Sequence, residues 1–312
     1  MKEDFMRRVN ASHPFFAAPL VVLTISVFVL FIQFVNVENM GKTAVYAVML
    51  ALQTAVFGIP AAIFCFFRGQ GYIFKLGFGL PRKKSLPVIV FGTLFFILSI
   101  CVLKFGLFHF AYDASAYSLY GSSISIRPTS FGSGLIMVLS LAALPALLEE
   151  LVFRGIVMRE YRMGGSFFSM IMSALLFAFV HFDLPQFPIY FVSGLILAWL
   201  VFLTKSVWAS VIAHFAYNLF ALFWEKYVWL FSSNPDSDIL FWLILIAILL
   251  VCAFFFLSFA ERLLRSHAER GEPAQRPVPK NKIALMLFDV FTSLPLLGEV
   301  LLFFVFGIIA LF

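Results

Sequence analysis

Residues 146–155, ALLEELVFRG, place two adjacent glutamates and an arginine inside an otherwise apolar stretch. An ionisable side chain within a bilayer costs roughly 2.5–3.5 kcal/mol on insertion scales, so each one is a functional candidate. Glu150 and Arg154 are spaced i,i+4 and can pair on one helix face, which offsets part of that cost. Glu149 points about 100° away from Glu150 and can therefore face a cavity. Pro145, one turn earlier, removes a backbone hydrogen bond and predicts a bend in the helix.

Two later apolar stretches contribute further polar groups. One contains His181, and the next contains His214 and Asn218, which are again spaced i,i+4 and share a helix face. A carboxylate with two imidazoles and a carboxamide can activate a water molecule and stabilise an oxyanion. The same groups can also coordinate a metal ion. Each group alone also fits a structural role, as an interfacial charge or a polar contact between helices.

The composition determines the kind of element that carries these residues. Of 312 residues, 62% are hydrophobic and 12% are charged, which predicts an all-α, polytopic membrane protein. The net charge of +6 does not indicate a nucleic-acid partner, because the basic residues lie in short segments between apolar runs. The three cysteines lack a CxxC spacing, so they predict neither a disulfide framework nor a zinc ribbon.

The apolar runs predict about eight transmembrane helices within a membrane domain of residues 1–262. A basic, proline-containing linker follows at 263–282, and a hydrophobic segment at 283–312 is either an interfacial helix with a ninth span or a re-entrant hairpin. Basic residues recur in alternate connections, which predicts a cytoplasmic N-terminus and a cytoplasmic linker. The predicted spans are 15–35, 43–67, 86–108, 132–160, 166–182, 187–204, 206–224 and 238–260.

Membrane depth shows whether the polar groups can meet. If the fourth span stays helical to Tyr161, Glu149 lies ~18 Å from the cytoplasmic end at ~1.5 Å per residue. The same count gives ~22 Å for His181 and ~12 Å for His214, with Asn218 one turn deeper. Groups from three different spans are therefore predicted to share one layer of the membrane.

These three stretches, in this order, resemble the CAAX-protease and bacteriocin-processing (CPBP, or Abi) family of membrane proteins. EELVFRG at 149–155 is similar to the EExxxR motif of that family, FAFVH at 177–181 to its FxxxH motif, and HFAYN at 214–218 to its HxxxN motif. EExxxR alone is a weak signal, whereas three motifs in order are specific. The resemblance covers about residues 140–220.

The resemblance implies an intramembrane endopeptidase with its protease core at about 132–224. It implies that Glu149, helped by His181, activates the attacking water, and that His214 and Asn218 stabilise the oxyanion. It assigns Glu150 and Arg154 to orienting and supporting the site. The expected substrate is a peptide or lipidated protein in contact with membrane lipid, cleaved in a cavity that opens to the cytoplasm. In a bacterium, the expected location is the plasma membrane.

Several alternatives stay open on the sequence alone. The family is described both as metalloproteases and as metal-free glutamate proteases, so the cofactor is either a divalent metal such as zinc or none; the HExxH arrangement of zincins is absent. A non-proteolytic immunity or scaffold protein would keep the same fold. A proton-coupled transporter would also bury carboxylates and histidines, but the chain shows no repeat that would indicate one. The sequence does not identify the oligomeric state.

Overall fold

The computed structural model describes residues 13–108 apart from positions 33, 36, 38 and 39, and residues 130–232, 238–271 and 280–311. Over these ranges the regular elements are all helical, which confirms the predicted all-α fold class. The α-helices are α2 (Pro14–Ile32), α3 (Lys42–Gln53), α4 (Ile59–Phe67), α5 (Leu86–Phe108), α6 (Phe131–Val138), α7 (Leu144–Glu150), α8 (Met158–Glu160), α9 (Ser166–Phe179), α10 (Phe187–Thr204), α11 (Val207–Phe223), α12 (Glu225–Ser232), α13 (Asp238–Glu269), α14 (Lys280–Phe291) and α15 (Leu294–Ile309).

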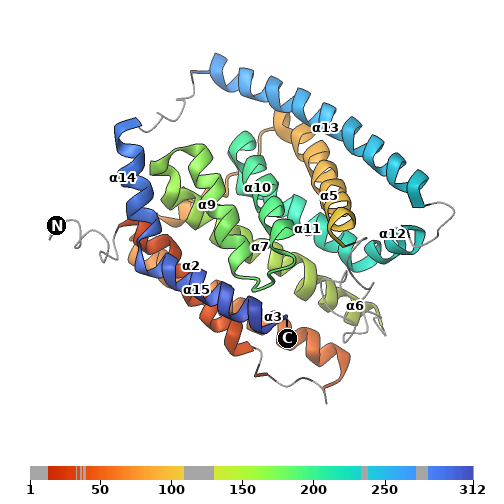
Figure 1. The fold of residues 1–312 in the computed structure, drawn as a ribbon, viewed down its shortest axis with the longest axis horizontal. Coiled ribbons are helices and arrows are strands. Elements are labelled where there is room, and N and C mark those ends of the chain that lie inside the picture. The colour runs from red at the N-terminus through yellow and green to blue at the C-terminus, as the bar shows by residue number, and fades with distance from the viewer. Residues whose placement is uncertain are drawn as a thin grey trace.

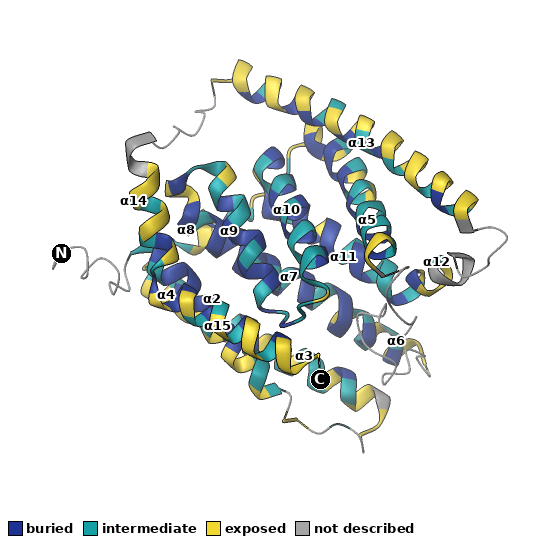
Figure 2. Cartoon of the chain, viewed as in Figure 1, coloured by how far each residue is buried: buried dark blue, intermediate teal, exposed yellow. Residues whose placement is uncertain are grey.

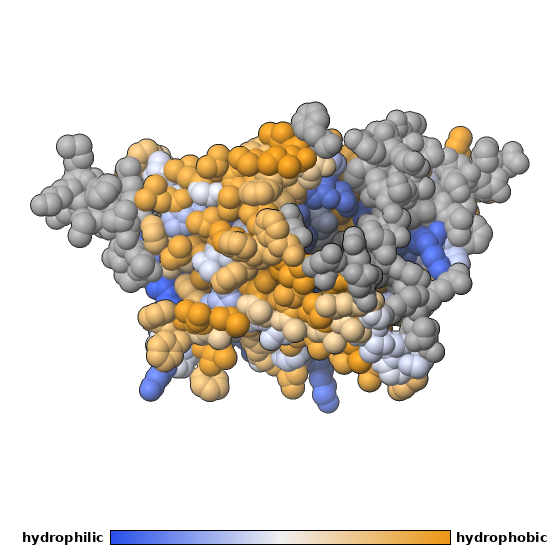
Figure 3. Space-filling view, turned by 90° about the horizontal axis from the view of Figure 1, so that it is seen from below, coloured by the Kyte–Doolittle hydropathy of each residue, from blue (hydrophilic) through white to orange (hydrophobic). Residues whose placement is uncertain are grey.

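Every predicted span corresponds to a helix or to a continuous run of helices. Among the described residues, six helices are long and apolar enough to cross a membrane. The fifth and seventh predicted spans form the shorter apolar helices α9, with 14 residues, and α11, with 17 residues. The chain is therefore an integral membrane protein, and its described surface is largely apolar on the face shown in Figure 3.

The fourth predicted span is continuous but is not a uniform α-helix. A π-helical segment, Leu139–Ala143, precedes α7, and a second one, Leu151–Val157, follows it. Pro145 lies in the first turn of α7, so the structure accommodates its missing backbone donor at the end of the first π-helical segment. π-helical segments occur frequently at functional sites, and here they flank the short helix that carries Glu149 and Glu150.

The buried core is divided into clusters around the central helices. One cluster joins α2, α4, the α7 region and α9, and a second joins α5, α10, α11 and α13. A third, smaller cluster joins α3, the region of α6 and α11. The central helices α7, α9, α10 and α11 are mostly buried, whereas α13 lies along one edge and exposes much of its length (Figures 1 and 2).

Helices α9 and α10 approach each other closely at Gly194. A Cβ atom added at Gly194 would lie 2.7 Å from the Cα atom of Ala174, which is closer than real Cβ atoms come to other atoms. Only glycine permits this approach, because any side chain would collide with the backbone of α9. The same residue presents its carbonyl oxygen to the side chain of Arg154.

The C-terminal hydrophobic segment forms a bent helix pair beside α2. Residues Ile283–Phe291 and Leu294–Ile309 are bent by 58° at the break between them. Ser26 Oγ donates a 2.7 Å hydrogen bond to Glu299 Oε1, so α15 is joined to α2 by a buried polar contact. The sequence analysis expected either an interfacial helix with a span or a re-entrant hairpin here. Both forms contain such a bend.

The last long helix, α13, continues beyond position 262, where the sequence analysis placed the start of the linker. It runs to Glu269, and Glu261 pairs with Arg265 one turn later at 2.5 Å on its exposed surface. Residues 272–279 of the predicted linker lie outside the described residues.

Candidate active site

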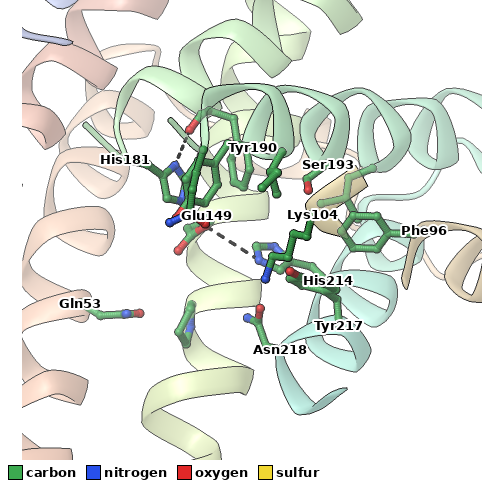
Figure 4. A pocket seen from close by; sticks show the side chains of 15 residues that line it. Gln53, Phe96, Lys104, Glu149, His181, Tyr190, Ser193, His214, Tyr217 and Asn218 are labelled. Atoms are coloured by element: carbon green, nitrogen blue, oxygen red, sulfur yellow. Dashed lines mark hydrogen bonds and ion pairs between the residues drawn. The ribbon is translucent and has the colours of Figure 1, made fainter. Parts of the chain in front are cut away.

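A cavity of about 210 Å³ lies among the central helices. Four of the six predicted site residues line it, from three different elements (Figure 4): Glu149 on α7, His181 just after α9, and His214 and Asn218 on α11. The other two, Glu150 and Arg154, are buried beside it. The complete lining is Gln53, Phe96, Lys104, Pro145, Glu149, Phe177, His181, Gln186, Ile189, Tyr190, Ser193, Leu197, His214, Tyr217 and Asn218.

Glu149 and His214 both line the cavity, and their side chains lie next to each other. Glu149 Oε2 lies 4.0 Å from His214 Nε2, and their side chains are 12% and 9% exposed. This distance exceeds a direct hydrogen bond, but both polar atoms lie close to the same space. A carboxylate and an imidazole at this separation can each contact one small polar group placed between them.

Glu150 holds the other side of His214. Its Oε1 atom accepts one hydrogen bond from Arg154 Nη1 at 2.7 Å and another from His214 Nδ1 at 3.0 Å. The i,i+4 ion pair predicted between Glu150 and Arg154 is present, and both side chains are 0% exposed. The contact with His214 was not predicted. A carboxylate oxygen only accepts, so Nδ1 of His214 carries a proton, and Nε2 is a donor only in the imidazolium form.

Arg154 joins three elements behind the cavity. Besides Glu150, it donates from Nη2 to the Gly194 carbonyl oxygen of α10 at 3.1 Å. Its guanidinium carbon lies 4.6 Å from the centre of the Phe177 ring of α9. A planar guanidinium can combine a carboxylate contact with ring stacking in a way that an ammonium group cannot. Arg154 therefore fixes the position of Glu150 relative to α9 and α10.

The hydrogen bond made by His181 defines which of its ring nitrogens carries the proton. Its Nδ1 lies 2.7 Å from the Phe177 carbonyl oxygen, and a carbonyl oxygen can only accept, so Nδ1 donates. In the neutral ring, Nε2 is then the acceptor. The ring stacks on Tyr190, with 3.8 Å between centroids and 20° between planes. The imidazole is therefore held in one orientation with an acceptor nitrogen available.

Asn218 is anchored through one of its two amide hydrogens. Nδ2 donates to the Ala142 carbonyl oxygen at 3.3 Å, in the π-helical segment that precedes α7. A carboxamide carries two N–H donors, so this bond occupies one of them. Asn218 thus connects α11 to the fourth predicted span and also lines the cavity.

The sequence analysis missed Lys104, a lysine within the third predicted span. It is 2% exposed, lines the cavity and forms an ion pair with Glu225 of α12. Its Nζ atom lies 5.9 Å from the centre of the Tyr217 ring. The rule that singled out the other buried charges, an ionisable group within an apolar run, would also have found it. The sequence analysis also missed Tyr190, because no sequence pattern distinguishes it from the many aromatic residues that only pack in the core.

The donors around the cavity do not fit a metal centre. Zinc sites use at least three protein ligands around one point. Among the described residues, no three His, Cys, Asp or Glu side chains are grouped closely enough to hold a metal ion. In addition, Nδ1 of His181 is bonded to a carbonyl, and Glu150 Oε1 is bonded to Arg154 and His214.

Comparison with known proteins adds evidence over the same segment. Residues 130–220 match the model of a family described as "Type II CAAX prenyl endopeptidase Rce1-like". The chain is also similar to the Bacillus subtilis (strain 168) protein named "Putative membrane peptidase YdiL", with 31% identity over 88 residues. That alignment covers 28% of this chain and 36% of the relative, so the chain spans about a third of the length of the curated relative it matches. No solved structure matches the chain.

The matched segment contains all six of the predicted site residues. It begins with α6 and ends within α11, and it therefore includes the three motifs and the helices that bring them together. At family level, this similarity supports a membrane peptidase. Residues 130–220 match the Rce1-like, type II CAAX prenyl endopeptidase family model, which confirms the resemblance that the three motifs indicated.

Proposed function

We propose that this protein is an intramembrane endopeptidase that hydrolyses a peptide bond of a lipid-associated or membrane-spanning substrate. The observation that carries the proposal is the convergence of Glu149, His181, His214 and Asn218 on one cavity. Glu150 and Arg154 support it from behind, at buried positions where they have no direct access to substrate. The family match over residues 130–220 gives the reaction class.

The first chemical step is attack by water on the peptide carbonyl carbon. Glu149 accepts a proton from the water, and His181 Nε2 accepts a hydrogen bond that orients it. The water oxygen then bonds to the carbonyl carbon, and the carbonyl oxygen becomes an oxyanion. The neutral tautomer of His181, with Nδ1 bonded to Phe177, supports this role because it leaves Nε2 as an acceptor.

The second step is collapse of the tetrahedral intermediate. His214, protonated on Nε2, and the second amide hydrogen of Asn218 donate to the oxyanion. Glu150 stabilises the imidazolium through the 3.0 Å bond to Nδ1. Glu149 returns its proton to the leaving nitrogen as the C–N bond breaks. The products are a new carboxylic acid and a free amine, so the water is fully accounted for.

The test is cleavage by the purified protein in lipid nanodiscs. The substrates are a prenylated CAAX peptide, the same peptide without its lipid, and a hydrophobic membrane peptide. Glu149→Gln should reduce the cleavage rate at least about 100-fold, because a general base contributes typically 10²–10⁴-fold. Glu299→Gln is the matched control: it neutralises a buried carboxyl joined to Ser26 and should cleave like the unmodified protein.

Two results would overturn the proposal. One is retention of full activity by Glu149→Gln. The other is an intact, folded protein that cleaves none of the three peptides, which would favour a non-proteolytic immunity or scaffold role. Lipid dependence of the rate identifies whether the substrate is prenylated. We also propose that the protein lies in the plasma membrane with its N-terminus in the cytoplasm.

A further inference from the structure

The two ends of the helix bundle differ sharply in charge. We call the end that carries most of the basic residues the basic face and the other end the opposite face. The described basic residues of the basic face are Arg68, Lys75, Arg82, Lys83, Lys84, Arg159, Arg162, Lys205, Arg262, Arg265 and Arg270. Lysine and arginine gather on the cytoplasmic side of membrane proteins, so the basic face is assigned to the cytoplasm.

The polar end of the cavity lies toward the opposite face. Lys104 is four residues from the end of α5, and the basic segment 82–84 precedes the other end of that helix. Gln186 is the residue before α10, whose far end reaches Lys205 on the basic face. His181 follows the end of α9, which starts beside Arg162. Lys104, His181 and Gln186 thus lie near the helix ends that are remote from the basic loops.

Between Glu149 and the basic face, the fourth predicted span carries many fully buried side chains. Val152, Phe153, Ile156, Val157 and Tyr161 follow Glu149 along the chain toward that face, and each of them is 0% exposed. On α10, the cavity residue nearest the basic face is Leu197, which is still seven residues, or ~10 Å, from Thr204.

Helix α9 is too short to cross the hydrocarbon core of a bilayer. Its 14 residues span only ~21 Å, against about 30 Å for the hydrocarbon core of a bilayer. If α9 starts at the basic face, residues 180–186 therefore lie at membrane depth without being helical. Irregular backbone at that depth occurs only where it is buried in protein or lines a water-filled cavity. Gln186 of this segment does line the cavity, and Pro185 beside it is exposed.

From this geometry we infer that substrate enters the cavity from the opposite face, and that the enzyme acts on peptide segments presented at the non-cytoplasmic side of the membrane. The inference rests on the proposed protease function for the nature of the substrate. It reverses the expectation from the sequence that the cavity opens to the cytoplasm. The substrate class becomes exported or outer-leaflet-anchored peptides.

Cysteine labelling in intact cells tests the access route without requiring any catalytic activity. The background replaces Cys65, Cys101 and Cys252 with alanine. Single cysteines are then introduced as Pro185→Cys and Lys226→Cys on the opposite face and as Lys83→Cys on the basic face, all at exposed positions. A membrane-impermeant maleimide should label the first two in intact cells. It should label Lys83→Cys only after permeabilisation.

A fourth variant, Ser193→Cys, reports on the cavity itself, because Ser193 lines it and has no assigned part in the reaction. A small, charged methanethiosulfonate added outside intact cells should modify it at least ten times faster than the same reagent added to sealed inside-out vesicles. If the Pro185→Cys variant does not insert into the membrane, Lys226→Cys on α12 still reports whether the opposite face is accessible from outside the cell.

Two outcomes overturn the inference. Labelling of Lys83→Cys in intact cells, with Lys226→Cys protected, would show that the bundle has the reverse orientation. Faster modification of Ser193→Cys from the inside-out side would show that the cavity is reached through the basic face. Neither outcome depends on cleavage, so this inference can fail while the proposed protease function holds. Equally, the protein can fail to cleave any peptide while the labelling results agree with the inferred access route.

Discussion

Glu150 and His214 lie 64 positions apart in the chain and are joined by a 3.0 Å hydrogen bond between Oε1 and Nδ1. The same oxygen atom accepts from Arg154 at 2.7 Å. A single buried carboxylate therefore fixes the imidazole on α11 and the guanidinium on the following helical turn. The two adjacent glutamates therefore have different roles: Glu149 faces the cavity, and Glu150 positions His214 beside it.

Replacing Glu150 with glutamine should destabilise the protein strongly. The change leaves the buried Arg154 without its counter-charge, and breaking a buried pair from one side costs about 3–5 kcal/mol. The matched control is Glu261→Gln, which breaks an i,i+4 pair with Arg265 whose side chains are 63% and 74% exposed. That exposed pair should cost at most about 1 kcal/mol. Denaturant unfolding in mixed micelles measures both, and equal losses would contradict the prediction.

The Lys104–Glu225 pair should show the asymmetry of buried charges. Lys104→Met leaves Glu225 buried without its partner and should lower the unfolding temperature by several degrees. The double variant Lys104→Met/Glu225→Leu removes both charges and should recover most of that loss. Thermal unfolding followed by circular dichroism measures each variant. A double variant that is less stable than either single variant would show that the charges stabilise the fold directly.

Gly194→Ala should reduce the cleavage rate at least about tenfold. The added Cβ would lie 2.7 Å from Ala174 Cα, so α9 and α10 must separate, and a displacement of about 1 Å in a site costs on the order of 100-fold in rate. The carbonyl of Gly194 would then move away from Arg154. Gly106→Ala is the control, because nothing lies within 4 Å of its added Cβ. Comparable rates for the two variants would show that the close approach has no effect on the reaction.

Removal of divalent metal should leave cleavage unchanged. The described residues present no group of three metal-ligating side chains, and the assigned proton transfers use Glu149, with His181 orienting the water. The protein is treated with EDTA and separately with 1,10-phenanthroline, and the cleavage rate is compared with that of the untreated protein. Loss of activity that zinc restores would show that a metal takes part in the reaction.

The sequence predicted the elements well because their signals are local. Long apolar runs indicate membrane helices whatever their neighbours, and each predicted span has a helical counterpart. The ion pair between Glu150 and Arg154 was likewise predictable, since both residues lie on one helical turn and a half. Counting residues also placed Glu149, His181, His214 and Asn218 in one layer, and the cavity includes all four of them.

Other parts of the site depend on contacts between distant segments. The sequence indicated that Arg154 would need a carboxylate, but not that the same carboxylate would hold His214. The pairing of Lys104 with Glu225 could not be predicted, because Glu225 lies 121 positions away and is brought close by the packing of α5 against α11. Gly194 gives no sign in the sequence that it allows two helices to touch.

By itself, the sequence determined that this chain is a helical membrane protein, that its charged residues gather at one end of the bundle, and that three motifs carry the polar groups of one site. These properties depend on hydrophobicity and on spacing along single helices. The tertiary structure alone decided which atom of each side chain faces the cavity and which distant residues meet there. Those features depend on how helices far apart in the sequence pack, because side-chain contacts fill or leave space only after the helices assemble.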